Sequence, residues 1–216
     1  MIYTDFSKAF DVINHDILLS KLVTYNFTSD FRQFMATYLC QRKQRIRFNG
    51  TVTKEYIVTS GVPQGSNLGP LLFLLFVNDL PKILKSHKLL FADDLKLFRN
   101  ITSYTDTVAL QEDMDKLYTW CETNKLLLNI NKCNVMTITR KVNYVKFNYN
   151  VNGIAMNRTE SVSDLGVTIK SNLTFTTHIN EVINNATRNL GFVMRLGKEF
   201  SDPEVMKKTL RHICTI

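Results

Sequence analysis

Apolar residues recur at helical spacing in several parts of the chain. The periodicity predicts helices over residues 16–25, 30–39, 71–78 and 106–124. Asn14 and Ser29 are the predicted N-caps of the first two helices. The third segment is apolar on nearly every side, which predicts a buried helix that is stopped by Pro81.

The C-terminal part is also helical by pattern. One apolar stripe predicts a long helix, with Ile179, Val182, Ile183, Ala186, Leu190, Val193 and Leu196 on the same face. The capping box that starts at Ser201 and ends at Glu204 predicts a final helix. This helix continues to Ile216, so the chain is expected to be a fragment.

Short apolar or alternating runs predict strands over residues 2–6, 45–48, 52–58, 88–91, 95–98, 135–139, 144–151 and 165–169. The dipeptides that begin at Asn49 and Asn152 are both Asn-Gly, the strongest short signal for a hairpin turn. Asp93 and Asp94 fit a tight turn between two of the runs. Strands that alternate with helices, with acids at strand ends, are typical of a helix-backed, largely antiparallel sheet of the α+β class. The helices after residue 170 are predicted to form a separate subdomain.

Three carboxylates are the candidate chemistry. Asp5 ends the first predicted strand, and Asp93 and Asp94 follow far along the chain. Between them lies the Gly/Pro-rich segment GVPQGSNLGP, which begins at Gly61. Carboxylates suit Mg²⁺ and Mn²⁺, and two such ions about 4 Å apart can clamp the attacking and leaving oxygens of a phosphoryl transfer. The pattern therefore predicts chemistry on nucleotides.

Composition narrows the class of protein. The chain has 216 residues, of which 44% are apolar and 21% charged, so it can bury one substantial core or two small ones. Its four cysteines show neither a CxxC pair nor zinc-ligand spacing with the histidines, which indicates a reduced, intracellular protein of the nucleus or cytoplasm. No targeting signal is visible, and the longest apolar run is too short to span a membrane.

The net charge of +8 suits a polyanionic partner such as nucleic acid. Basic residues cluster in two patches, one of Arg42, Lys43, Arg45 and Arg47 and one of Arg195, Lys198, Lys207, Lys208 and Arg211. A solvated face explains either patch by itself as well as binding does.

The motifs resemble those of a known family. DFSKAFD from Asp5, GVPQGSNLGP from Gly61 and FADD from Phe91 occur in this order, as in the palm of reverse transcriptases, most closely those of non-LTR (LINE-like) retrotransposons. LLNINKC from Leu127 resembles the next palm motif, and SDLGV from Ser163 resembles the segment that leads into the thumb. FADD alone is typical of a solvated turn, whereas the ordered set is specific.

The resemblance implies roles for individual residues. Asp5 and Asp93 would bind two Mg²⁺ or Mn²⁺ ions, with Asp94 completing the site and the Phe6 carbonyl as a further ligand. Phe10 would act as a steric gate that excludes the ribose 2′-hydroxyl. Without the motif, each of these residues has an ordinary structural explanation.

Other implied roles concern the substrates. Pro63, Gln64 and Gly65 would form the loop that packs against the incoming nucleotide and the template. Lys132 would lie near the nucleotide phosphates. By analogy, Leu165 and Gly166 would help to hold the primer end. Ser7, Lys8 and Asp11 match their motif and are assigned structural or phosphate-side roles.

The resemblance therefore implies an RNA-directed DNA polymerase that uses an RNA template, a DNA primer and deoxynucleoside triphosphates. Residues 1–170 would be the palm without its fingers, and residues 171–216 a truncated thumb-like segment. One alternative is a catalytically dead nucleic-acid-binding remnant. Another is a different two-metal enzyme, such as a nuclease, although GVPQGS and the absence of histidine near the acids argue against it.

Overall fold

The computed structural model describes residues 1–197, 204 and 207–208. The chain divides into two compact units. The first unit comprises Met1–Thr137 and Lys141–Thr159, and the second comprises Ile138–Arg140 and Glu160–Ile216. In the part of the chain that the structure describes, no helix combines the length and apolar character that a bilayer crossing requires.

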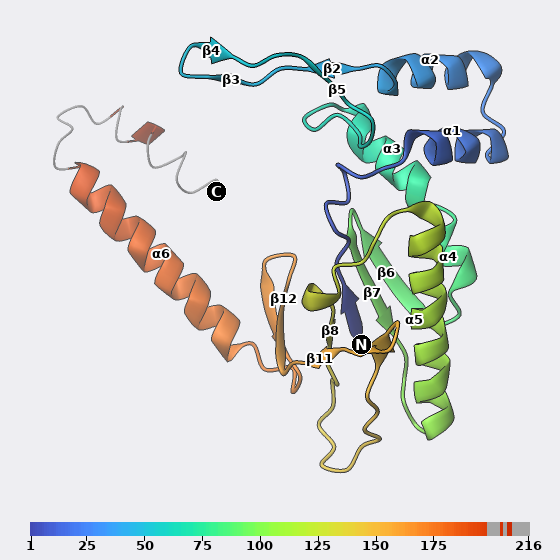
Figure 1. The fold of residues 1–216 in the computed structure, drawn as a ribbon. Coiled ribbons are helices and arrows are strands. Elements are labelled where there is room, and N and C mark those ends of the chain that lie inside the picture. Colours follow the sequence, from blue (N-terminus) through green and yellow to red (C-terminus); the bar gives the residue numbers. More distant parts are fainter. Residues whose placement is uncertain (198–203, 205–206, 209–216) are drawn as a thin grey trace. The chain divides into compact units, whose positions relative to one another are not determined.

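A five-stranded sheet organises the first unit (Figure 1). Its middle strand is β1 (Ile2–Thr4), which pairs antiparallel with β7 (Asp94–Phe98) on one side and with β8 (Asn134–Val135) on the other. Beyond β7 lies β6 (His87–Phe91), and beyond β8 lies β11 (Asn157–Arg158), which is parallel to β8. The predicted largely antiparallel sheet of an α+β fold is thus confirmed.

Helices and sheet share one core. The helices of the first unit are α1 (His15–Thr24), α2 (Ser29–Leu39), α3 (Leu68–Val77), α4 (Leu80–Ile83) and α5 (Tyr104–Asn124), with a 3₁₀ turn at Ile130–Lys132. Ile2 and Leu97 form a cross-strand pair that is fully buried, together with Met114 and Leu117 of α5. Burial of such apolar side chains is the main favourable contribution to folding.

Two short ribbons complete the first unit. One contains β2 (Lys43–Gln44), β3 (Arg47–Phe48), β4 (Thr51–Val52) and β5 (Tyr56–Ile57). In it β2 pairs with β5 and β3 pairs with β4. The other ribbon pairs β9 (Asn150–Val151) with β10 (Ile154–Ala155). Both predicted Asn-Gly turns are confirmed, and all four of their residues have positive φ, as a two-residue hairpin turn of this kind requires.

The second unit joins a hairpin to a long helix. The hairpin pairs β12 (Ser161–Asp164) with β13 (Val167–Lys170), and α6 (Thr176–Gly197) follows. The hydroxyl of Thr168 donates to Glu181 Oε2 at 2.6 Å, and this bond ties β13 to α6. The helix predicted from the apolar stripe is therefore confirmed.

Several helix predictions were wrong in detail. Thr28, not Ser29, caps α2, and its hydroxyl accepts a hydrogen bond from the backbone of Phe31. Pro81 does not stop a helix but lies in the first turn of α4. Backbone N–H groups in a first turn have no partner within the helix, so proline's missing N–H costs nothing there. The helix α3 begins at Leu68, three residues before the predicted start, and its Leu71 and Leu74 are exposed rather than buried.

Strand predictions were too long. Of the segment predicted at residues 135–139 only Val135 is in a strand, β8, and of the segment predicted at 144–151 only Asn150–Val151 is a strand. Leu165 and Gly166 form the turn between β12 and β13 instead of starting a strand, and both have positive φ. The predicted capping box and final helix lie outside the described residues, apart from Glu204, Lys207 and Lys208.

The cysteines are free thiols where the structure describes them. Cys121 and Cys133 are buried, and Cys40 is half-buried. Burial raises the pKa of both Cys121 and Cys133, so these thiols stay protonated and unreactive. Cys214 lies outside the described residues.

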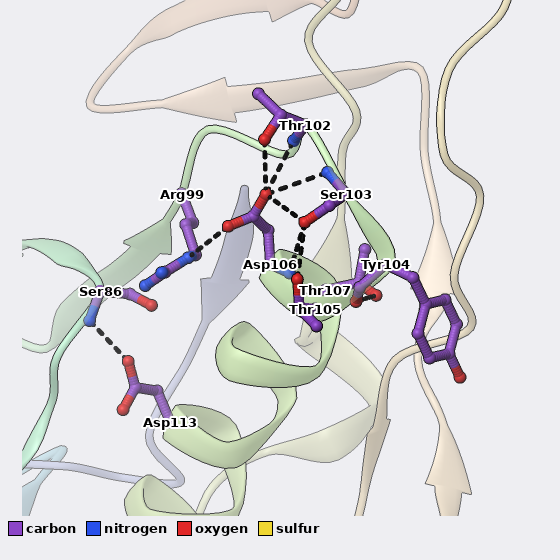
Figure 2. A network of polar contacts seen from close by, with 9 residues as sticks. All are labelled: Ser86, Arg99, Thr102, Ser103, Tyr104, Thr105, Asp106, Thr107 and Asp113. Atoms are coloured by element: carbon purple, nitrogen blue, oxygen red, sulfur yellow. Dashed lines mark hydrogen bonds and ion pairs between the residues drawn. The ribbon is translucent and has the colours of Figure 1, made fainter.

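Two aspartates of α5 are held by hydrogen bonds (Figure 2). Asp106 completes a capping box with Ser103 and also accepts from the backbone and hydroxyl of Thr102. Its other oxygen pairs with Arg99 at 3.4 Å. The bonds from Thr102 and Ser103 hold the pKa of Asp106 well below its ordinary value.

Asp113 is buried about two turns further along α5, and it accepts from the chain that enters β6. Its oxygens take the backbone N–H of Ser86 at 2.6 Å and that of Lys85 at 3.1 Å. Lys116 lies 3.3 Å away. Burial acts to raise the pKa of Asp113, but these bonds outweigh it and the pKa is lowered.

Acid should therefore destabilise the fold through these carboxylates. Both carboxyls have a lower pKa in the folded state than in the unfolded state, where it is near 4. Their contribution to the free energy of unfolding is therefore complete above about pH 4, and it is lost as the pH falls through the folded-state pKa. We expect urea titrations to show the free energy of unfolding falling below about pH 4. Asp113→Asn should flatten part of this slope and cost about 2 kcal/mol at neutral pH. An unchanged slope in the variant would show that Asp113 carries none of the acid response.

Candidate active site

The pairing of β1 with β7 brings the predicted acids to one end of the sheet. Thr4 lies opposite Leu95, and its hydroxyl donates to the Leu95 carbonyl at 2.9 Å. Asp5 follows Thr4 and Asp94 precedes Leu95, so the register places the two acids at the same end of neighbouring strands. Asp93 lies in the adjoining turn.

The turn itself differs from the prediction by one residue. Phe91 pairs with Asp94, so Ala92 and Asp93 are the two turn residues and Asp94 is the first residue of β7. Ala92 has a φ of 49°, which places it in the left-handed region. The hairpin still presents Asp93 at its tip, directly beyond the strand that pairs with β1.

A third segment, residues 127–129, pairs with residues 5–7 and completes the candidate site. The Ser7 N–H donates to the Leu127 carbonyl and the Asn129 N–H donates to the Asp5 carbonyl, both at 2.8 Å. These two bonds flank the antiparallel pair of Phe6 and Leu128. In such a pair the Phe6 carbonyl points away from its partner segment, so this pairing does not use it.

This third segment brings a lysine to the acids. Lys132 Nζ lies 3.3 Å from Asp5 Oδ2. The Asp5 side chain is 28% exposed, yet its Oδ2 is buried and accepts no hydrogen bond. A buried carboxylate oxygen without a donor is a suitable ligand for a hard cation. Among the residues that the structure describes, however, no three acidic, histidine or cysteine side chains gather into a metal-binding cluster.

The glycine-rich loop is clamped to the turn that follows Asp5. The Val62 N–H donates to the Phe10 carbonyl and the Gly61 N–H donates to the Ile13 carbonyl, both at 2.8 Å. Gly61 has a φ of 82°, and a Cβ on it would lie 2.6 Å from the carbonyl oxygen of Asp11. The two motifs can therefore meet this closely only because residue 61 has no side chain.

Side chains reinforce the clamp. Gln64 Nε2 donates to Asp11 Oδ1 at 2.8 Å, which gives Gln64 a defined partner in the first motif. The Ser60 hydroxyl donates to the Asp11 carbonyl at 2.9 Å. His15 is buried, with its Nε2 at 2.8 Å from the Gly61 carbonyl. The sequence contained no signal for His15, because its partner lies 46 residues away.

The ring of Phe10 packs against a residue of α3. Its ring stacks on that of Phe73, with 4.7 Å between centroids and an angle of 28° between the ring planes. Phe73 is fully buried, whereas Phe10 is half-buried. The packing fixes one face of the Phe10 ring close to the segment that carries Asp5.

The other predicted site residues are Pro63, Gly65, Leu165 and Gly166. The Pro63 carbonyl accepts from the Ser66 hydroxyl, and Gly65 is exposed with a φ of 75°. Leu165 and Gly166 belong to the second unit, so their predicted contact with a primer at this site stays a prediction.

The close approach at Gly61 can be tested by a pair of alanine variants. Gly61→Ala adds a backbone clash to an unfavourable φ and should cost at least about 3 kcal/mol of unfolding free energy. Gly65→Ala has the unfavourable φ but open space around the new Cβ, so it should cost about 1 kcal/mol. Chemical denaturation measures both, and equal losses would mean that Asp11 does not restrict residue 61.

A helix-backed antiparallel sheet with acids on adjacent strands defines a polymerase palm. Residues 1–169 match the family described as reverse transcriptase (RNA-dependent DNA polymerase). The chain belongs to this family.

Relatives and a solved structure agree with this assignment. A probable RNA-directed DNA polymerase from transposon BS of Drosophila melanogaster is 29% identical over 191 residues, which cover 82% of this chain and 21% of the relative. The RNA-directed DNA polymerase from mobile element jockey of Drosophila funebris is 28% identical over 189 residues, with 83% and 20% covered. The chain thus spans about one fifth of the length of these relatives.

The fold has a counterpart among solved structures. Apo telomerase from Candida tropicalis, truncated from its C-terminal domain, aligns with a TM-score of 0.53 at 13% identity. The alignment covers 81% of this chain and 34% of the telomerase chain. At this identity the likeness shows that the two share a fold.

Proposed function

We propose that this chain is the palm portion of an RNA-directed DNA polymerase of a non-LTR retrotransposon, and that it extends a DNA primer along an RNA template. The observation that carries the proposal is the β1–β7 register, which brings Asp5 to the hairpin that holds Asp93 and Asp94. The GVPQG loop, which is clamped to the turn that follows Asp5, supports it.

Asp5 and Asp93 would hold two Mg²⁺ or Mn²⁺ ions, with Asp94 and the Phe6 carbonyl as further ligands. The buried Oδ2 of Asp5, which accepts no hydrogen bond although the Lys132 ammonium lies 3.3 Å away, supports this assignment. Because the described acids do not form a complete cluster, the phosphates of the substrate would supply the remaining ligands. Bound metal would activate the primer 3′-hydroxyl and stabilise the charge that develops on the pyrophosphate.

Lys132 and the loop would act on the incoming nucleotide. Lys132 is close enough to Asp5 for its ammonium to neutralise a triphosphate held at the same place. Gln64 and its neighbours Pro63 and Gly65 would face the nucleotide and template, with Asp11 fixing the Gln64 amide. Phe10, fixed on Phe73, would exclude a ribose 2′-hydroxyl.

The wider assignments complete the proposal. The partners would be an RNA template, a DNA primer and deoxynucleoside triphosphates, inside the cell, in the nucleus or cytoplasm. Residues 1–170 would be the palm, in which Leu165 and Gly166 would help to hold the primer end, and residues 171–216 would be the start of a thumb.

The central test is primer extension with Asp93→Asn. Loss of this carboxylate should abolish incorporation of deoxynucleotides on a poly-RNA template with Mg²⁺ or Mn²⁺, because one ligand of both metals is lost. Folding should be unaffected, since Asp93 lies in a turn and is not part of the core. Asp115→Asn, the same change at an exposed position of α5, should leave incorporation as it was.

Other results would separate the alternatives. Equal extension by wild type and Asp93→Asn would refute the proposed metal site. Salt-sensitive binding of a template–primer without any extension would identify a catalytically dead nucleic-acid-binding remnant. Metal-dependent degradation without synthesis would identify a different two-metal enzyme.

The proposed steric gate against the ribose 2′-hydroxyl is tested by Phe10→Ala. Removing the ring should raise the ratio of kcat/KM for ribonucleotides to that for deoxynucleotides by about tenfold or more, because the added hydroxyl meets no wall. Phe31→Ala truncates a stacked ring of α2 and serves as the control. An unchanged ratio in Phe10→Ala would assign the ring to packing alone.

A further inference from the structure

The ribbon formed by β2 to β5 is strongly basic and largely exposed. Every residue from 45 to 57 is exposed, so this part of the ribbon contributes nothing to the buried core. Residues 42–58 contain a single acid, Glu55, against five basic residues, namely Arg42, Lys43, Arg45, Arg47 and Lys54. The polymerase site proposed above gives this ribbon no role.

Three of the five basic residues, Lys43, Arg45 and Arg47, occupy alternate positions and so face the same side of the ribbon. Lys43 Nζ lies 3.2 Å from Glu55, and Arg45 pairs with the other oxygen of the same carboxylate. Both side chains are about 60% exposed, so their charges reach solvent. Arg47 follows at the same alternation. One carboxylate shared by two cations leaves this face with an excess of positive charge.

The other face bears an aromatic ring and amides. The Tyr56 hydroxyl donates to Gln44 Oε1 at 2.7 Å, directly across the strand pair. Both residues line a cleft of about 600 Å³ at the base of the ribbon, together with Arg42. Gln64 of the clamped loop and Asp11 of the first motif also line this cleft. The cleft thus combines a guanidinium, a phenol ring, two amides and a carboxylate.

This set of groups matches the chemistry of an unpaired nucleotide. A guanidinium pairs with phosphate, an aromatic ring stacks on a base of any type, and amide and carboxylate oxygens accept from the exposed edge of a base. A paired base in a duplex offers neither its face nor that edge. Beyond the cleft, the basic face would follow the phosphates of the same strand, and Phe48, 74% exposed near the ribbon turn, offers a second stacking surface.

We propose that the ribbon and the cleft at its base bind a single-stranded nucleic acid. The inference rests on the proposed function only in that the polymerase supplies such a strand, the RNA template ahead of its paired part. No metal takes part in the binding, so the two proposals can fail separately.

The first experiment measures binding of a fluorescent poly(U) oligoribonucleotide in EDTA. Lys43→Gln/Arg47→Gln should weaken binding by about tenfold and reduce the slope of log affinity against log salt by roughly 0.7 for each residue. The control Lys82→Gln/Lys85→Gln removes the same charge from exposed lysines at α4 and just after it and should bind as wild type. Equal losses in both double variants would overturn the proposal, since general charge would then explain them.

The second experiment separates a single strand from a duplex. Tyr56→Ala should weaken poly(U) binding by about fivefold through lost stacking, whereas Tyr104→Ala, another exposed tyrosine, should have no effect. Binding of a blunt RNA–DNA duplex should be unchanged in Tyr56→Ala. An equal loss with the duplex would overturn the single-strand assignment.

Two controls keep the result interpretable. All of these substitutions lie at exposed positions, so thermal unfolding should show unchanged midpoints. Asp93→Asn should bind poly(U) in EDTA as wild type does. A chain without polymerase activity that still shows the ribbon-specific losses would support this proposal and refute only the proposed function.

Discussion

The antiparallel pairing of β1 with β7 is the constraint on which the candidate site depends. Side chains alternate between the faces of a strand, so a slip by one residue would turn Asp5 to the opposite face from Asp94. Ile2 and Leu97 prevent such a slip, because both are fully buried and lie opposite each other. The apolar core therefore sets the register, and the register sets the meeting of the acids.

Elements around the sheet are held by polar contacts as well as by packing. Lys21 of α1 is buried, and its ammonium donates to Asp79 and to the Phe76 carbonyl at 2.7 Å. The same ammonium lies over the ring of Trp120 at 4.6 Å, which joins α1, α3 and α5 at one point. The helices α1 and α3 directly follow the two segments that form the clamp, so these contacts help to hold the clamp in place.

Opposite charges are separated within the first unit. The acids lie at the end of the central sheet, whereas the basic side chains lie on the ribbon between α2 and the GVPQG loop. A polyanionic strand would be attracted by the ribbon and repelled by bare acids, so the acids need cations before a phosphate can approach them. The clamp couples the two regions, since Asp11 and Gln64 belong to the site's motifs and also line the cleft of the ribbon.

The amino-acid sequence by itself determined the α+β class, the Asn-Gly turns, the long amphipathic helices and the motifs that identify the family, because these depend on local spacing and residue type. Tertiary structure alone decided where strands end, since a strand extends only as far as its pairing, and β8 and β9 pair over two residues each. It also decided the partners of Asp11, His15 and Lys21. Those contacts join residues 46 to 58 positions apart, and no local pattern encodes a distance through space.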